Sequence, residues 1–125
     1  MNHNWQDILV PPSASMEETI AVIDKGALKL ALVADETKRL LGIVTDGDIR
    51  RALLRHLTMD TPITEVMHKS PIVAAEDTSK SRLMQMMNNH SLMAIPLLRD
   101  GILVGLETMQ KLFKRRKYDN PVFLM

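Results

Sequence analysis

The 125-residue chain contains no cysteine, few aromatic side chains and no long apolar run. The lack of cysteine excludes disulfides and zinc–thiolate sites and fits a reducing compartment. With aromatic residues at 3%, a stacking platform for nucleic-acid bases is not expected. No stretch reaches the roughly 18 apolar residues that a membrane-spanning helix needs, and the N-terminus lacks the basic start of a signal peptide. A cytoplasmic location without membrane contact is therefore expected, and the formal net charge of +1 gives no reason to expect nucleic acid as a partner.

The signatures of several enzyme classes are missing as well. The sequence has no Gly-x-Ser-x-Gly elbow and no Gly-x-x-x-x-Gly-Lys phosphate loop. The four histidines, at positions 3, 56, 68 and 90, lack metal-ligand spacing. Asp46 and Asp48 follow an apolar strand, as in haloacid-dehalogenase-type phosphotransferases, but the second half offers no further acidic cluster to hold Mg²⁺. We expect neither catalytic residues nor a metal site, so the chain by itself is not expected to be an enzyme.

The apolar pattern of the first half predicts an alternation of strands and helices. An extended piece at Leu9–Val10 precedes a helix over residues 16–25, which Ser13 or Ser15 caps and Gly26 closes. Strands are predicted at residues 30–34 and 40–45, with a polar hairpin loop between them. The next helix begins at Asp46 as its cap, and the spacing of Ile49, Leu53 and Leu57 predicts that these three face inward.

The second half repeats this order. It predicts an extended piece at 71–73, a helix at 79–89 with Leu83, Met86 and Met87 inward, strands at 93–98 and 102–107 around a tight turn, and a helix at 109–114. A shift of 63 residues places Gly42 on Gly105 and Thr45 on Thr108 without a gap. This agreement indicates a tandem repeat of a β-α-β-β-α unit. The methionine-rich stretch around residues 84–93 is either part of a core or a self-association surface.

The segment from Gly42 to Arg50 carries the chemistry. An apolar strand enters a turn with the hydroxyl of Thr45 and, three residues later, the carboxylate of Asp48. A carboxylate can accept hydrogen bonds from two adjacent ribose hydroxyls, a hydroxyl can donate to a phosphate, and a helix N-terminus favours anions. The same residues could equally serve as a helix cap and a strand end. Ribose-phosphate binding and simple capping both remain open at this point.

The doubled β-α-β-β-α unit with its Gly-h-h-Thr-x-x-Asp turn, where h is apolar, resembles a pair of cystathionine-β-synthase (CBS) domains, a Bateman module. The resemblance covers residues 9–112 and is most specific over residues 41–67. It implies an α/β (α+β) fold of two pseudo-symmetric repeats packed sheet to sheet, with repeats at 1–62 and 63–114. It further implies a regulatory module that forms homodimers and takes AMP, ADP, ATP or another nucleotide as its ligand.

The resemblance also implies which residues bind the ligand. They are Thr45, Gly47, Asp48, Lys29, Ile72, Leu92, Met93 and Ala94. Asp48 and Thr45 would hold the ribose and phosphate, Lys29 would be aimed at the phosphate, and Ile72 with residues 92–94 would cover the base. The second repeat has Lys111 where the first has Asp48, and an ammonium group accepts no hydrogen bond. At most one ribose-type site is therefore expected.

The C-terminal residues 120–125 look like the first strand of a sugar-phosphate nucleotidyltransferase, and the basic run 111–117 would be the hinge before it. On this interpretation residues 115–125 are a linker and the truncated start of a covalently attached catalytic domain, which the module regulates. Two alternatives stay open. The module could be a ligand-free dimerisation scaffold of the same enzyme, or the CBS pair of a sugar-phosphate isomerase, in which similar Thr-Asp-Gly-Asp turns occur.

Overall fold

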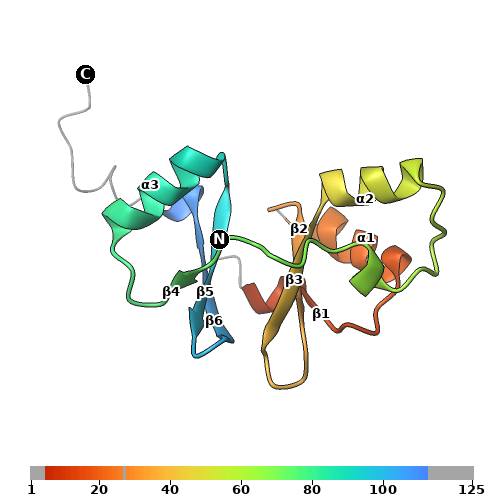
Figure 1. Cartoon of the computed structure of the whole chain (residues 1–125), viewed down its shortest axis with the longest axis horizontal. Helices are drawn as coiled ribbons and strands as arrows, with labels where there is room; N and C mark the ends of the chain where they lie inside the picture. The colour runs from red at the N-terminus through yellow and green to blue at the C-terminus, as the bar shows by residue number, and fades with distance from the viewer. Residues whose placement is uncertain (1–4, 27, 113–125) are drawn as a thin grey trace. The chain divides into compact units, whose positions relative to one another are not determined.

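The computed structural model describes residues 5–26 and 28–112, and these form two compact units with the same order of elements (Figure 1). The first unit runs through Pro71 and includes Gly101–Leu103, and the second comprises Ile72–Asp100 and the chain from Val104. Residues 115–125, predicted to start a catalytic domain, lie outside the described residues. No helix in the described part of the chain is long and apolar enough to cross a bilayer.

The first unit is a three-stranded sheet with two helices on one face (Figure 1). Its main elements are β1 (Leu9–Val10), α1 (Met16–Lys25), β2 (Leu30–Ala34), β3 (Leu40–Thr45) and α2 (Asp46–Leu54), with short 3-10 turns η1 (Trp5–Ile8) and η2 (Ile63–Glu65). The central strand β2 pairs in parallel with β1 and antiparallel with β3. All five residues of β2 are buried, as expected for a strand with neighbours on both edges and an apolar sequence.

Local hydrogen bonding explains where α1 begins. Ser15 is the N-cap: its Oγ accepts from the Glu18 backbone N–H at 3.1 Å, and Glu18 Oε1 accepts from the Ser15 N–H at 2.9 Å. This reciprocal capping box satisfies two N–H groups that have no partner inside the helix. Of the two serines considered from the sequence, Ser15 is therefore the cap, and the predicted bounds of the helix are confirmed.

The second unit repeats the arrangement with β4 (Ala74–Ala75), α3 (Lys80–His90), β5 (Ala94–Arg99) and β6 (Ile102–Thr108), in the sheet order β4-β5-β6. Asp100 and Gly101 form the predicted tight turn, with φ of 55° and 82°. Positive φ at both central positions matches the twist of a two-residue hairpin. Helical residues begin again at Met109 and reach Leu112, the last described residue. The α+β fold of two repeats is thus confirmed.

Methionines fill the interior of the second unit. Met87 is fully buried beside Leu83 and Ile95, and Met84 and Met86 pack partly buried against this cluster. The unbranched side chain of Met adapts to irregular spaces, which suits a small core. The predicted inward orientation of Leu83, Met86 and Met87 is confirmed, with Met86 partly buried. Met93, by contrast, is 66% exposed.

The prediction of an ungapped repeat is wrong. The caps Ser15 and Ser79 are 64 positions apart, as are the buried Ile23 and Met87, whereas Thr45 and Thr108 are 63 apart. The first strand of the second unit also starts later than predicted, at Ala74 rather than 71, because Ala74 and Ala75 are the residues that pair with β5. Apolar residues are frequent enough in both helices that a shift of one still aligned many of them.

The predicted inward face of α2 needs a correction too. Ile49 and Ala52 are buried, whereas Leu53 is 45% exposed. Leu57 lies beyond the end of the helix but packs, partly buried, against the same core, as predicted. Positions three apart on a helix share a face, so Ile49 and Ala52 together contact the core.

Candidate ligand-binding site

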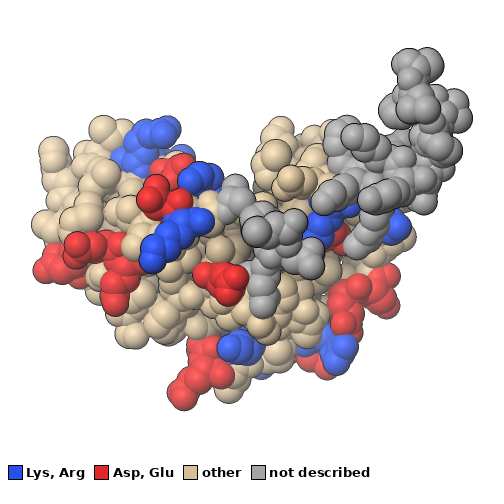
Figure 2. Space-filling view, turned by 180° about the vertical axis from the view of Figure 1, so that it is seen from behind, with Lys and Arg blue, Asp and Glu red and all other residues tan. Residues whose placement is uncertain are grey.

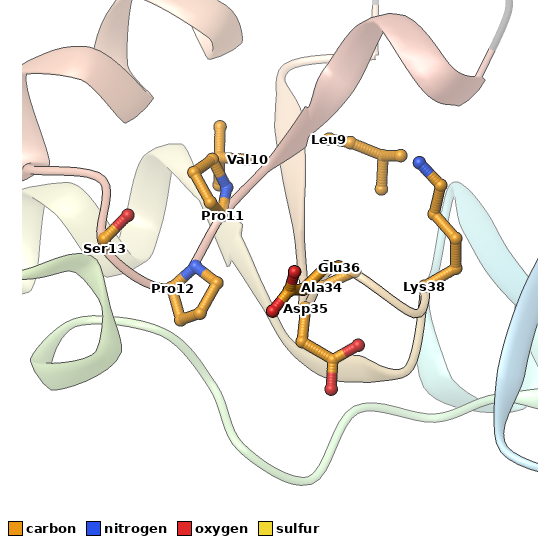
Figure 3. Close-up of a pocket in the computed structure, with 9 residues that line it drawn as sticks. All are labelled: Leu9, Val10, Pro11, Pro12, Ser13, Ala34, Asp35, Glu36 and Lys38. Carbon is orange, nitrogen blue, oxygen red and sulfur yellow. The ribbon is translucent and has the colours of Figure 1, made fainter.

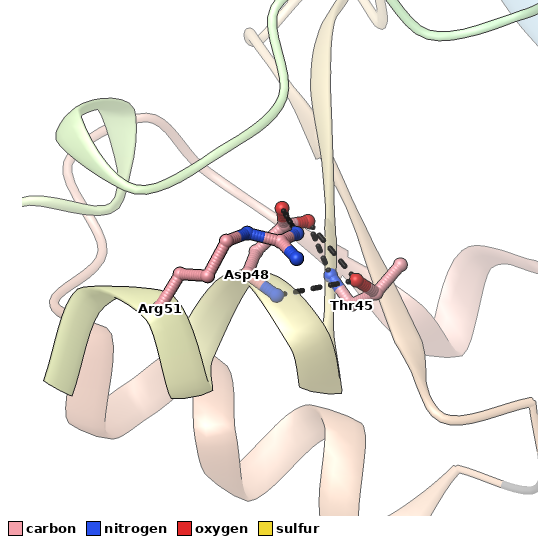
Figure 4. A network of polar contacts seen from close by, with 3 residues as sticks. All are labelled: Thr45, Asp48 and Arg51. Carbon is pink, nitrogen blue, oxygen red and sulfur yellow. Dashed lines mark hydrogen bonds and ion pairs between the residues drawn. The ribbon is translucent and has the colours of Figure 1, made fainter. Parts of the chain in front are cut away.

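The turn between β3 and α2 is a second capping box (Figure 4). Thr45, not Asp46 as predicted, is the N-cap: its Oγ1 accepts from the Asp48 N–H at 3.4 Å. The Asp48 carboxylate returns to the strand end, where Oδ2 accepts from the Thr45 N–H at 2.9 Å. Asp46 is the first residue of the helix itself. The strand end and the first helical turn therefore fix the position of the Asp48 carboxylate.

Both oxygens of this carboxylate have partners. Oδ2 also accepts from the Thr45 hydroxyl at 3.1 Å, so that hydroxyl directs its proton to Asp48. Oδ1 accepts from Nη2 of Arg51 at 2.7 Å (Figure 4). The Asp48 side chain is 13% exposed, and that of Arg51 is 69% exposed. The two contacts from Thr45 are built into the fold, whereas Arg51 is a surface partner.

Gly47 lies in the first turn beneath the Arg51 guanidinium. A Cβ at this position would lie 3.4 Å from Nη1 and 3.5 Å from Nη2 of Arg51. That contact is close to the limit of ordinary packing. A side chain at position 47 would therefore touch the guanidinium without a clash.

Asp48 lines an open cavity of about 400 Å³ along α2, together with Arg51, Leu54, Arg55 and Val66. The basic groups of this cavity are the guanidinium groups of Arg51 and Arg55. Neither arginine is among the binding residues predicted from the sequence. Their spacing of three and seven residues from Asp48 is the signal that could have found them, because such positions share one face of a helix.

Lys29, the basic residue that was predicted to bind the phosphate, lines a different cavity. Its neighbours there include Asp24, Asp46 and Ile49, and the volume is about 130 Å³. Its Nζ donates to the backbone carbonyl of Asp24 at 3.2 Å, near the end of α1. A cation at this place interacts favourably with the carbonyl end of the helix. The structure therefore does not bring Lys29 into the cavity that Asp48 lines.

The remaining predicted residues belong to the second unit. Ile72 and Ala94 are half-buried and Leu92 is as well, while the Met93 side chain is mostly exposed. Residues 92–94 connect α3 to β5, and the Met93 carbonyl accepts from the Met109 N–H at 2.9 Å. Thr108 repeats half of the capping box, since its Oγ1 accepts from the Lys111 N–H at 3.1 Å. Lys111 has no carboxylate that could accept a hydrogen bond from the cap residue, as Asp48 does in the first repeat. Its Nζ instead donates to the Leu106 carbonyl at 3.1 Å.

A third cavity, of about 490 Å³, lies at the end of β1 and beside the β2–β3 hairpin loop (Figure 3). The loop is organised by Asp35, whose Oδ1 accepts from the N–H and hydroxyl of Thr37 and from the Arg39 N–H, at 2.9, 2.7 and 3.0 Å. These bonds, the Thr37 hydroxyl above all, hold the pKa of Asp35 below its usual value. None of the predicted ligand-binding residues lines this cavity.

Charges of both signs are intermixed on the molecular face shown in Figure 2, among the residues that are coloured there. This distribution agrees with the small net charge of the chain. A continuous basic surface is the electrostatic footprint of nucleic-acid binding, and that face does not show one. The local concentration of charge that bears on a ligand is the trio Asp48, Arg51 and Arg55 around one cavity.

Two α+β units in tandem, the first with a capped Thr-x-x-Asp turn at the edge of a cavity, define a paired-repeat module. The family comparison agrees: the CBS domain family matches residues 4–55 and 63–117. The chain belongs to the CBS domain family.

Relatives by sequence are longer proteins. An uncharacterized protein of Rickettsia prowazekii is 31% identical over 98 residues, which are 78% of this chain and 30% of that protein. The inosine-5′-monophosphate dehydrogenase of Aquifex aeolicus is 25% identical over 115 residues, 90% of this chain and 23% of the enzyme. The chain thus spans less than a third of the length of these relatives. Neither carries the name of a nucleotidyltransferase, so the expected attachment to such an enzyme has no support from them.

Solved structures share the fold. A CBS-domain containing protein of Agrobacterium tumefaciens has a TM-score of 0.74 at 21% identity and covers 87% of this chain and 88% of its own. A CBS domain protein of Pyrobaculum aerophilum, complexed with AMP, has a TM-score of 0.74 at 22% identity, with coverage of 88% and 84%. CBS domains can therefore bind AMP. At these identities the likeness to this chain is one of fold.

Proposed function

We propose that this chain is a regulatory CBS-pair module that binds an adenine nucleotide, or a related nucleoside phosphate, at the Thr45–Asp48 turn. The observation that carries the proposal is the position of the Asp48 carboxylate. Two hydrogen bonds from Thr45 hold it at the wall of a cavity that two arginines also line. A fixed carboxylate is suited to a ribose diol, and guanidinium groups and a helix N-terminus are suited to a phosphate.

The Pyrobaculum aerophilum protein that was solved with AMP supports the choice of ligand. In the proposed complex Asp48 accepts hydrogen bonds from the ribose hydroxyls, Thr45 keeps the carboxylate in place, and Gly47 leaves the turn open. The phosphate would lie toward Arg51 and Arg55 rather than Lys29. One such site is proposed for each chain, because the second repeat has Lys111 in place of the carboxylate.

A second candidate function is a ligand-free dimerisation scaffold. Leu53 and Leu54 are 45% and 73% exposed on α2, and large apolar side chains exposed side by side favour self-association. Attachment to a catalytic domain, whether a nucleotidyltransferase or an isomerase, is compatible with both candidates. The relatives that carry an enzyme name here are inosine-5′-monophosphate dehydrogenases, which makes that class of enzyme an equally reasonable context.

The test is a calorimetric titration of the purified chain with AMP, ADP, ATP, CMP and GTP, alongside Asp48→Asn and Glu18→Gln. Asparagine keeps an oxygen that can accept from the Thr45 N–H, so the cap survives while the charge is lost. Glu18 occupies the same place in the α1 capping box, far along the chain from the cavity residues, and glutamine preserves that box. We expect one nucleotide to bind the wild type and the Glu18 variant alike.

The Asp48 variant should bind that nucleotide at least about tenfold more weakly, the loss of a charge-assisted hydrogen bond. Equal nucleotide affinity in all three proteins would show that Asp48 does not contact the nucleotide. No binding to the wild type, combined with a stable dimer in sedimentation, would favour the scaffold function.

A further inference from the structure

The Arg51 guanidinium is hydrogen-bonded to Oδ1 of Asp48, the oxygen that a ribose hydroxyl would use. Its Nη2 donates to Oδ1 of Asp48 at 2.7 Å, while the Thr45 N–H and hydroxyl both donate to Oδ2. A carboxylate offers about four lone-pair positions in all. With Arg51 in place, a single position on Oδ1 remains, whereas a ribose diol brings two hydroxyl donors. Binding of both hydroxyls therefore requires Arg51 to leave the carboxylate.

Arg51 is free to leave. Its side chain is 69% exposed, and among residues 5–26 and 28–112 its guanidinium donates to Asp48 alone. Its i, i+3 pairing with Asp48 is of the kind that contributes little on a helix surface. Asp48, at 13% exposure and fixed by Thr45, stays where it is. The movable partner in this pair is the arginine.

The cavity beside it provides a second place for the guanidinium. Arg51, Leu54 and Arg55 line the cavity on one face of α2, with Arg55 one turn beyond Arg51. Along the helix axis Arg51 is about 4.5 Å and Arg55 about 10 Å from Asp48. A phosphate on the 5′ carbon of a ribose held by Asp48 would lie within reach of both guanidinium groups, and Arg binds phosphate in a bidentate manner.

We propose that Arg51 exchanges its partner on ligand binding, from the Asp48 carboxylate to the ligand's 5′-phosphate, and that this exchange makes the site select nucleotides over nucleosides. The inference rests on the proposed function. A nucleotide replaces the ion pair that it breaks with a new one. A nucleoside breaks the same ion pair but has no phosphate with which the guanidinium could form a new one.

The exchange predicts opposite effects of one substitution on two ligands. In Arg51→Gln the carboxylate has no competing guanidinium, so adenosine should bind as well as in the wild type or better. AMP should bind at least about tenfold more weakly, because a charge-assisted contact to phosphate is lost. A merely structural role for Arg51 would weaken both ligands together.

The experiment is calorimetric titration of AMP and of adenosine into the wild type, Arg51→Gln and Arg50→Gln. Arg50 is the matched control: it is exposed, it adjoins Arg51, its loss changes the net charge equally, and it does not line the cavity. The expected result is a ratio of AMP to adenosine affinity that falls at least about tenfold in Arg51→Gln and stays at the wild-type value in Arg50→Gln.

An unchanged ratio of AMP to adenosine affinity in Arg51→Gln would overturn the exchange. An equal fall of that ratio in Arg50→Gln would also overturn it, because the change in net charge would then explain the effect. In both cases Asp48-dependent AMP binding by the wild type would leave the proposed function intact. Absence of AMP and adenosine binding to the wild type would overturn the proposed function and the exchange with it.

Discussion

The two capping boxes of the first unit allow a matched stability test, Asp48→Ala against Glu18→Ala. Each carboxylate accepts from the backbone N–H of its own cap residue at 2.9 Å. Asp48 additionally accepts from the Thr45 hydroxyl at 3.1 Å and from Arg51, and only 13% of its side chain is exposed. Glu18 is exposed, and within the α1 cap its carboxylate accepts from the Ser15 N–H but not from the Ser15 hydroxyl.

The difference in environment sets the expected magnitudes. Loss of a capping interaction costs about 1 kcal/mol, and loss of a carboxylate in the first turn adds about 0.3–1 kcal/mol through the helix dipole. The ion pair with the exposed Arg51 adds little, and the better helix propensity of alanine offsets roughly half a kcal/mol. We expect Asp48→Ala to lower the free energy of unfolding by about 0.8–1.5 kcal/mol, and Glu18→Ala, which loses no hydroxyl contact and is exposed, by less.

Urea denaturation followed by far-ultraviolet circular dichroism measures both values, and an unchanged slope with denaturant would show that the unfolded reference is the same. The reasoning is refuted if Asp48→Ala is no less stable than Glu18→Ala. That result would mean that the extra hydroxyl contact and the partial burial of Asp48 do not stabilise the strand-to-helix turn.

Two further predictions concern packing and pH. Gly42→Ala should destabilise the first unit by about 1–3 kcal/mol through overpacking, because a Cβ would lie 2.7 Å from Met67 Sδ and 2.8 Å from the His68 carbonyl. Gly105→Ala, whose Cβ would meet nothing nearer than Leu97 Cδ1 at 3.5 Å, is the control; equal melting temperatures of the two variants would contradict this account. For pH, the Thr37 hydroxyl is the main cause of the lowered pKa of Asp35. Its folded-state pKa below the unfolded value means that Asp35 stabilises the fold above its usual pKa, and that this contribution is lost as pH falls through the lowered value. Thr37→Val should therefore raise the Asp35 pKa toward its usual value in a carboxyl NMR titration, and an unchanged midpoint would show that the hydroxyl is not the cause.

Local features of this protein follow from the sequence by itself. The serines before residue 16, the Asp100-Gly101 turn and the apolar run Leu30–Ala34 predict a helix cap, a hairpin and a strand, and all three are present. The Thr45-x-x-Asp48 pattern likewise implies a turn with a hydroxyl and a carboxylate in reach of each other. In each case the residues that determine the feature lie at most a few positions apart. A short segment of sequence therefore contains all of them.

Only the tertiary structure decided the choices that depend on distant segments. It selected Ile49 and Ala52, rather than Leu53, as the buried face of α2, because α1 and the sheet determine which side of that helix has room for side chains. It paired Ala74 with β5 and so introduced the offset between the repeats that an ungapped alignment had hidden. It placed Lys29 on the end of α1 and Arg51 and Arg55 beside Asp48. Which side chains are buried or lie close together depends on how segments far apart in the sequence pack. A single segment of sequence does not specify that packing.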